Sequence, residues 1–178
     1  MKLFICMLSL ILIQLSASAK NLPESIEHQD DLFQLCDQYT LRYGFVIKVA
    51  EIGWYAPECK GSSVLTELSH KILRFHYHKN VAADFFKKSA EEYFLLNLQN
   101  QEEQKILIDH LRTFNDAYTD ISSGEYFDLI HWKDKQLSLW KNKQLLIKTE
   151  HAAFARQYFN IWFGEVPVIE KLKSAFLE

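Results

Sequence analysis

Apolar and polar positions alternate along much of the chain, most clearly between residues 41 and 57, which read LRYGFVIKVAEIGWYAP. Apolar, β-branched and aromatic residues of this kind are typical of β-strands. The pattern predicts one long strand at the centre of a sheet, with one apolar face and one mixed face. Gly44 and Gly53 lie inside this strand, where a missing side chain often marks a bend, a bulge or a close approach by another segment or a ligand.

The segments on either side predict further strands and helices. Residues 20–40 predict a pair of strands with a turn at residues 29–31. After the long strand, the sequence predicts a short helix following residues 61–63, a half-buried strand at 71–78 and a helix capped by Asn80. It then predicts a second helix at 102–118, a three-stranded meander at 125–149 and two helices that begin at Glu150 and after Pro167. This order predicts an α+β protein whose antiparallel sheet is layered against helices.

The first nineteen residues have the pattern of a secretory signal peptide. Lys2 precedes an apolar run at residues 3–15, and Ala17-Ser18-Ala19 is a small-residue cleavage signal. The apolar run is shorter than the roughly 20 residues that a membrane-spanning helix needs. We therefore expect cleavage after Ala19, a single mature domain of residues 20–178, and a periplasmic or secreted location.

Charge gives little reason to expect a polyanionic partner. The formal net charge of −3 becomes −4 once Lys2 is removed with the signal peptide. A chain of this charge offers no general attraction to nucleic acid or to an anionic membrane surface. We expect no nucleic-acid partner, no membrane insertion of the mature chain, and a monomer.

Cleavage would leave two cysteines, Cys36 and Cys59. An even number suits a disulfide in an oxidising compartment. However, the predicted long strand separates them, and 17 extended residues span roughly 50 Å at about 3.3 Å each, whereas bridged Cα atoms lie about 6 Å apart. Unless the chain bends strongly, we expect two free, buried thiols.

Four segments resemble the chalcone isomerase-like family, especially its exported bacterial branch. They are LRYGFVIKVAEIGWYAP, LRFHYHKNVAADFFKK, LSLWKNKQLL and FARQYFNIWFGEVPV, and in this order they extend over nearly the whole mature chain. The resemblance implies an open-faced β-sandwich, in which a large antiparallel sheet carries a layer of helices. It also implies a ligand cleft between the sheet and the helices that follow Asn80.

The resemblance further implies which residues face this cleft. Isomerases of the family close a ring by attack of a phenoxide on an enone, which requires a donor near the enolate oxygen. Arg42 is similar in place to the family's catalytic arginine, and Lys88 matches a family lysine. Other polar family positions are substituted, a threonine by Ala50, a tyrosine by Phe85, an asparagine by Glu92 and a hydroxyl residue by Ile161.

These substitutions argue against chalcone isomerisation and suggest three functions. The first is an exported protein that binds a small amphipathic ligand such as a fatty acid, with Arg42 and Lys88 available to its carboxylate. The second is an isomerase or lyase acting on an enone, in which Arg42 stabilises the enolate and Tyr43, Tyr93 or Tyr126 supplies the missing hydroxyls. The third is a non-catalytic interaction module of the cell envelope. None of the three requires a cofactor.

Each candidate also has a structural explanation. Arg42 at a strand end could pair with Asp37 or face solvent, and Lys88 follows Lys87 on a helix where a solvated face is the default.

His76 and His78 share one face of a strand, but a zinc site needs a third ligand, and no Cys, Asp or Glu lies near them in sequence. We therefore expect no metal site. The aromatic residues Phe154, Tyr158, Phe159, Trp162 and Phe163 could form a wall of a ligand site, but we expect most of them in the core.

Overall fold

In the part of the chain that the structure describes, seven strands form one antiparallel sheet, and their order across the sheet is their order in the sequence. The computed structural model describes residues 21–60, 64 and 70–177, so the predicted signal peptide and the predicted helix after residues 61–63 lie outside the described residues. The strands are β1 (Ser25–His28), β2 (Asp31–Tyr43), β3 (Ile47–Ala56), β4 (Lys71–Tyr77), β5 (Tyr126–His131), β6 (Leu137–Lys141) and β7 (Gln144–Thr149). The helices are α1 (Ala83–Leu96), α2 (Gln101–Asp116), α3 (Ala152–Phe163) and α4 (Glu170–Leu177).

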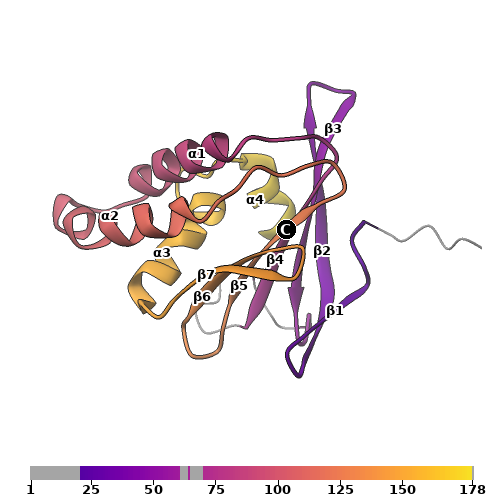
Figure 1. Cartoon of the computed structure of the whole chain (residues 1–178), viewed down its shortest axis with the longest axis horizontal. Helices are drawn as coiled ribbons and strands as arrows, with labels where there is room; N and C mark the ends of the chain where they lie inside the picture. The colour runs from indigo at the N-terminus through magenta and orange to yellow at the C-terminus, as the bar shows by residue number, and fades with distance from the viewer. Residues whose placement is uncertain (1–20, 61–63, 65–69, 178) are drawn as a thin grey trace, which may run out of the picture.

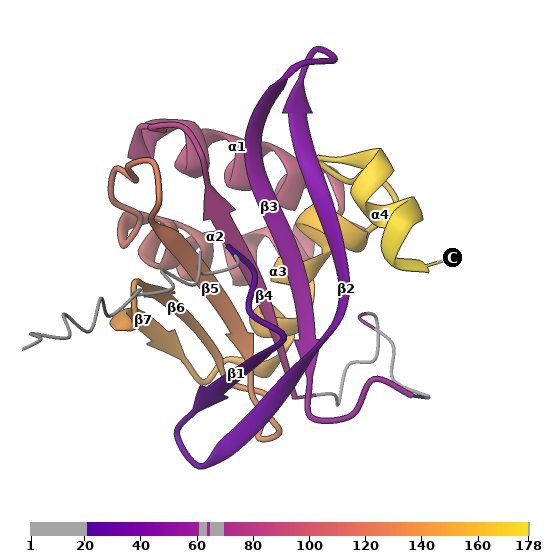
Figure 2. The same cartoon turned by 90° about the vertical axis from the view of Figure 1, so that its right-hand side faces the viewer.

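The helices lie against one side of the curled sheet, and the other side is open except where the N-terminal segment crosses it (Figures 1 and 2). The helix-facing side holds the main core, in which Phe94, Phe114, Phe154 and Tyr158 are fully buried. This arrangement confirms the predicted α+β class and the sheet layered against helices. None of the helices in the described part of the chain is long and apolar enough to span a membrane.

The prediction of one long strand at residues 41–57 was wrong. The chain reverses at residues 44–46, between β2 and β3, and Gly44 adopts a φ of 61° there. The hairpin projects beyond the neighbouring strands (Figure 2), and Phe45 in its turn is 98% exposed. Polar residues usually mark a turn, but here apolar residues fill it, and only Gly44 signals the reversal in sequence.

The hairpin also overturns the expectation of free thiols. Cys36 lies in β2 and Cys59 lies just beyond β3, and the antiparallel pairing of these strands brings the two ends together. The two residues form a disulfide with a Cα–Cα distance of 5.1 Å. The strong bend that a disulfide required is the turn at Gly44.

The N-terminal segment covers part of the outer face, which we define as the side of the sheet away from the helices. The Tyr55 hydroxyl donates a hydrogen bond to the carbonyl oxygen of Pro23. A Cβ on Gly53 would lie 3.3 Å from Leu22, 3.0 Å from Leu35 and 2.7 Å from Tyr55. Gly53 therefore allows the close approach that its place in the strand suggested.

Asn80 does not cap α1 as predicted. Its side-chain oxygen instead accepts a hydrogen bond from the Ser123 backbone N–H at 2.9 Å. Ala82 occupies the N-cap position, and the Ala83 N–H donates to Asp120 Oδ1, which belongs to the segment before β5. A long-range partner thus satisfies a helix N–H that a local cap was expected to satisfy.

Candidate functional site

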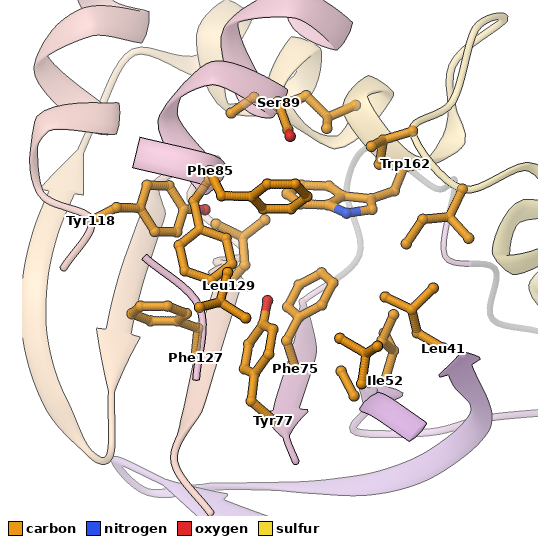
Figure 3. Close-up of a pocket in the computed structure, with 18 of the residues that line it drawn as sticks. Leu41, Ile52, Phe75, Tyr77, Phe85, Ser89, Tyr118, Phe127, Leu129 and Trp162 are labelled. Carbon is orange, nitrogen blue, oxygen red and sulfur yellow. The ribbon is translucent and has the colours of Figure 1, made fainter. Parts of the chain in front are cut away.

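An apolar cavity of about 270 Å³ lies between the helix-facing side of the sheet and the helices. Strands β2 to β6 form its floor, and α1, α3 and the segment before α4 close it from above. Figure 3 shows Phe75, Phe127 and Leu129 on the sheet side and Phe85 and Trp162 on the helix side. The other lining residues are Leu41, Arg42, Tyr43, Val49, Ala50, Ile52, Tyr77, Val81, Phe86, Ser89, Ala90, Tyr118, Leu139, Ile161, Val168 and Ile169.

The sequence pattern explains why this space is apolar. In β4, Phe75 and Tyr77 alternate with residues that face outwards, so both aromatic rings turn towards the helices. In α1, Phe85 and Ser89 are four residues apart and lie on the same side of the helix, as do Phe86 and Ala90. The small residues Ala50, Ser89 and Ala90 leave space that larger side chains would fill.

Three polar groups border the cavity from inside. The Tyr77 hydroxyl, the Ser89 hydroxyl and the Trp162 indole nitrogen all point towards the space in Figure 3. None of the three has a hydrogen-bond partner among the described residues. Burial raises the pKa of Tyr77, so its hydroxyl keeps its proton and remains a donor. These groups can therefore orient one or two polar atoms of an otherwise apolar ligand.

The cavity opens beside the β2–β3 hairpin. Arg42 and Tyr43, at the end of β2, line it but are exposed, and Phe85 at the start of α1 is 64% exposed. Arg42 forms no ion pair within the described part of the chain, neither with Asp37 nor with another carboxylate. A cation therefore stands at the mouth of an apolar space, with solvent as its partner.

Four of the six site residues that the sequence suggested line this cavity. Arg42 lies at the mouth, and Ala50, Phe85 and Ile161 form part of the wall. Lys88 and Glu92 do not line it, and both are exposed on the surface of α1. Besides Phe85, α1 lines the cavity with Phe86, Ser89 and Ala90, so the residue after Lys88 faces the cavity in its place.

Sequence reasoning did not single out Tyr77, Ser89 or Trp162 as polar groups of the cavity. The alternation in β4 placed Tyr77 on an apolar face, and Trp162 belonged to the aromatic stripe expected in the core. Phe154 and Tyr158 of that stripe are indeed buried. The Tyr158 hydroxyl donates to Asn115 Oδ1 at 3.0 Å and lies 3.2 Å from the Tyr118 hydroxyl. Of the residues in the stripe, Trp162 lines the cavity, together with the neighbouring Ile161.

The domain combines an open-faced antiparallel sheet, a layer of helices and an apolar cavity between them. These features define an α+β domain of the type that binds small ligands. The chain belongs to the chalcone isomerase-like family, whose family model matches residues 15–178. A comparison with curated proteins gave no match.

Among solved structures, the chain is similar to a fatty-acid-binding protein from Arabidopsis thaliana. The two share 14% sequence identity and superpose with a TM-score of 0.59, over 88% of this chain and 90% of the plant protein. At this identity the similarity supports the fold, and fatty-acid binding is a property of the plant protein.

Proposed function

We propose that this protein binds a small amphipathic ligand, with a fatty acid as the best candidate, and that it does not catalyse isomerisation. The observation that carries the proposal is the composition of the cavity. Its wall is almost entirely aromatic and aliphatic, and Arg42, the one cationic residue among the described lining residues, lies at the mouth. A hydrocarbon tail gains free energy by leaving water for such a space, at roughly 25 cal/mol for each Å² of apolar surface buried.

The two ends of the cavity suit the two ends of a fatty acid. The tail would lie between Phe75 and Phe86, and the carboxylate would remain near Arg42, where it keeps part of its hydration. Arg42 offers a carboxylate the fork of donors that arginine presents. The fatty-acid-binding protein with the same fold supports this choice of ligand.

No observation favours the enone isomerase. Three positions where the family carries polar residues are apolar in the cavity wall, at Ala50, Phe85 and Ile161. Arg42 is exposed, so water would screen its charge and weaken its effect on an enolate. Of the tyrosines considered as substitutes, only Tyr43 lines the cavity, and it is largely exposed.

A purely structural or interaction module would be expected to have a filled core. The cavity between α1 and the sheet does not fit that expectation. A ligand-binding function therefore explains the cavity, and an interaction module does not.

We also propose that the protein is exported and acts in the periplasm or outside the cell. The N-terminal sequence pattern is the first support. The Cys36–Cys59 disulfide is the second, because disulfides persist in oxidising compartments and are rare in the cytosol. Cell fractionation should find the processed chain outside the cytosol, and an unprocessed cytosolic chain would contradict the proposal.

Native mass spectrometry of the processed protein tests ligand binding directly. The protein should be produced in bacteria with its own leader and purified without detergent. We expect a monomer that carries one small acyl species, identifiable after solvent extraction. If the protein is empty and also fails to take up an added long-chain fatty acid, the proposed function is wrong.

A further inference from the structure

Three potential metal ligands lie together on the outer face of the sheet. Glu51 is in β3, and its registry partner in the adjacent strand β4 is His76. His78 follows two positions further along the chain and has the same orientation as His76. One ligand atom from each of the three side chains lies within 4.8 Å of the other two, and His78 Nε2 is only 3.1 Å from Glu51 Oε2.

The third ligand that the histidine pair lacked in sequence is thus supplied by a neighbouring strand. Glu51 is 25 residues before His76, and only the pairing of β3 with β4 brings it into reach. This placement removes the reason for which the sequence predicted no metal site.

His76 provides an independent observation. Its exposed fraction is 9%, and its Nδ1 atom is buried without a hydrogen-bond partner in the described structure. Buried polar atoms normally have a partner, because an unpaired one loses its hydration without compensation. The ring lies 5.2 Å from the ring of His78 between centroids, so the unpaired nitrogen belongs to a side chain that is part of the cluster.

We propose that Glu51, His76 and His78 bind a Zn²⁺ ion on the outer face of the sheet. Two histidines and one glutamate form a recurrent zinc ligand set, in which a water molecule takes the fourth position. His78 and Glu51 remain partly exposed, so the ion and this water can reach the site from solvent. Burial lowers the pKa of His76, which also favours the neutral imidazole that a metal requires.

The ligands need only a small rearrangement to close around the ion. Bond lengths of about 2.0–2.1 Å in a tetrahedral site place neighbouring ligand atoms about 3.4 Å apart. The His78–Glu51 distance of 3.1 Å already meets this requirement. Partly exposed side chains such as these can change rotamer at little cost, so they can move towards the more rigid, buried His76.

Lys48 and Asn21 form the surroundings of the site. Both donate hydrogen bonds to Glu51, and Lys48 contacts Oε1, the oxygen that does not face His78. These contacts orient the carboxylate, as outer-shell groups do in metal sites. The Lys48 ammonium opposes a second cation, but the side chain is 34% exposed and can turn into solvent when the ion binds.

The proposed metal site is separate from the apolar cavity. Tyr77 lies between the two histidines in β4, and its side chain points to the opposite side of the sheet, into the cavity. Zinc binding and fatty-acid binding are therefore two distinct properties, and a test of one can fail without affecting the other.

Calorimetric titration with Zn²⁺ tests the site, using protein without a polyhistidine tag after treatment with EDTA. We expect one Zn²⁺ per chain for the wild type. Glu51→Gln and His78→Gln, which keep the size of the side chains, should each weaken binding by at least about tenfold. His110→Gln serves as the control, because His110 forms another close histidine pair with His151, at 4.2 Å between ring centroids.

Two further readouts separate loss of the ligands from loss of the fold. Zn²⁺ should raise the melting temperature of the wild type and of the control, and it should raise the melting temperature of the two ligand variants less. The melting temperatures of these two variants without metal show whether they are folded. Co²⁺ should give the visible absorption of a four-coordinate site only when all three ligands are present. Absence of saturable one-to-one binding, or equal binding by the wild type and both ligand variants, would overturn the proposal.

Discussion

Arg74 and Asp128 form a bidentate ion pair between β4 and β5 on the outer face of the sheet. Nε and Nη2 of Arg74 donate to the two carboxylate oxygens at 2.7 and 2.6 Å. The two side chains are only 9% and 5% exposed, and the guanidinium carbon lies 4.0 Å from the centre of the Tyr126 ring. Each charge therefore depends on the other for its compensation, because little water reaches either.

Removal of one partner should destabilise the protein strongly. We expect Asp128→Ala to lower the free energy of unfolding by about 3 to 5 kcal/mol, since it leaves a buried, unpaired guanidinium. Urea denaturation measures this change. Asp109→Ala is the matched control, because the Asp109–Arg112 pair is exposed and 3.9 Å apart, so its loss should cost less than about 1 kcal/mol. The double variant Arg74→Met, Asp128→Leu should recover much of the loss, and a double variant as unstable as Asp128→Ala would contradict this account.

The Cys36–Cys59 disulfide should contribute strongly to stability. It closes a loop across a sequence separation of 23 residues, which the loop-entropy model converts to about 3 kcal/mol. Reduction, or the double replacement of both cysteines by serine, should lower the free energy of unfolding by about this amount. A thiol titration of the denatured, unreduced chain from residue 20 onwards should find no free thiol, and two free thiols would show that the bond does not form.

The order and type of most elements were readable from the sequence because their signals are local. The alternation of side chains in β4 predicted that Phe75 and Tyr77 lie on one face and Arg74 and His76 on the other. In the structure, these two pairs lie on opposite sides of the sheet. The β2–β3 hairpin was missed because its turn is apolar. The error in the cysteine pairing followed directly, since the distance between Cys36 and Cys59 depends on that turn.

The candidate sites depend on relations that local patterns do not contain. Glu51 joins the histidines only through the register between β3 and β4. A shift of one residue around α1 decides that Ser89, and not Lys88, faces the cavity. The cavity itself results from the combined volumes of side chains from several elements, so no single segment predicts it.

Acid should destabilise the protein through buried histidines, and His70 is the clearest case. Its ring packs against Phe33 and Trp132, and neither ring nitrogen has a hydrogen-bond partner among the described residues, although Nδ1 lies 3.4 Å from Asp31 Oδ2. Burial lowers the pKa of His70, and the nearby Asp31 offsets only part of this effect. Below the unfolded pKa of about 6.5, the unfolded chain therefore binds more protons than the folded one, and stability falls as the pH falls.

The free energy of unfolding should therefore decrease between about pH 7.5 and pH 5. His28 and His76, whose pKa values burial also lowers, should add to this decrease. His70→Phe keeps an aromatic ring in the site and removes the titrating group, so it should reduce the loss of stability on acidification. Urea denaturation at both pH values measures the difference, and an identical pH dependence in both proteins would show that His70 does not contribute.

Arg42 should distinguish an acid from an alcohol. Arg42→Ala should weaken binding of a long-chain fatty acid about two- to fivefold, because an exposed ion pair contributes less than about 1 kcal/mol. The same variant should bind the fatty alcohol of equal chain length as tightly as the wild type, since the tail contacts are unchanged. Displacement of a fluorescent fatty acid measures both affinities. Arg112→Ala removes an exposed arginine of α2 and is the control; equal effects of Arg42→Ala on acid and alcohol would exclude the anchoring role.

Ser89 should control whether the cavity is open. Ser89 faces the cavity from α1, whereas its neighbour Lys88 is exposed. A phenylalanine at position 89 would occupy the space that the tail requires, so Ser89→Phe should weaken binding of both the fatty acid and the fatty alcohol by at least about tenfold. Lys88→Phe adds the same ring at an exposed position of α1 that does not line the cavity, and this variant should bind both ligands normally. The smaller replacement Ser89→Leu should have an intermediate effect, and comparable melting temperatures would confirm that the variants are folded. Normal binding by folded Ser89→Phe would place the ligand elsewhere than in this cavity.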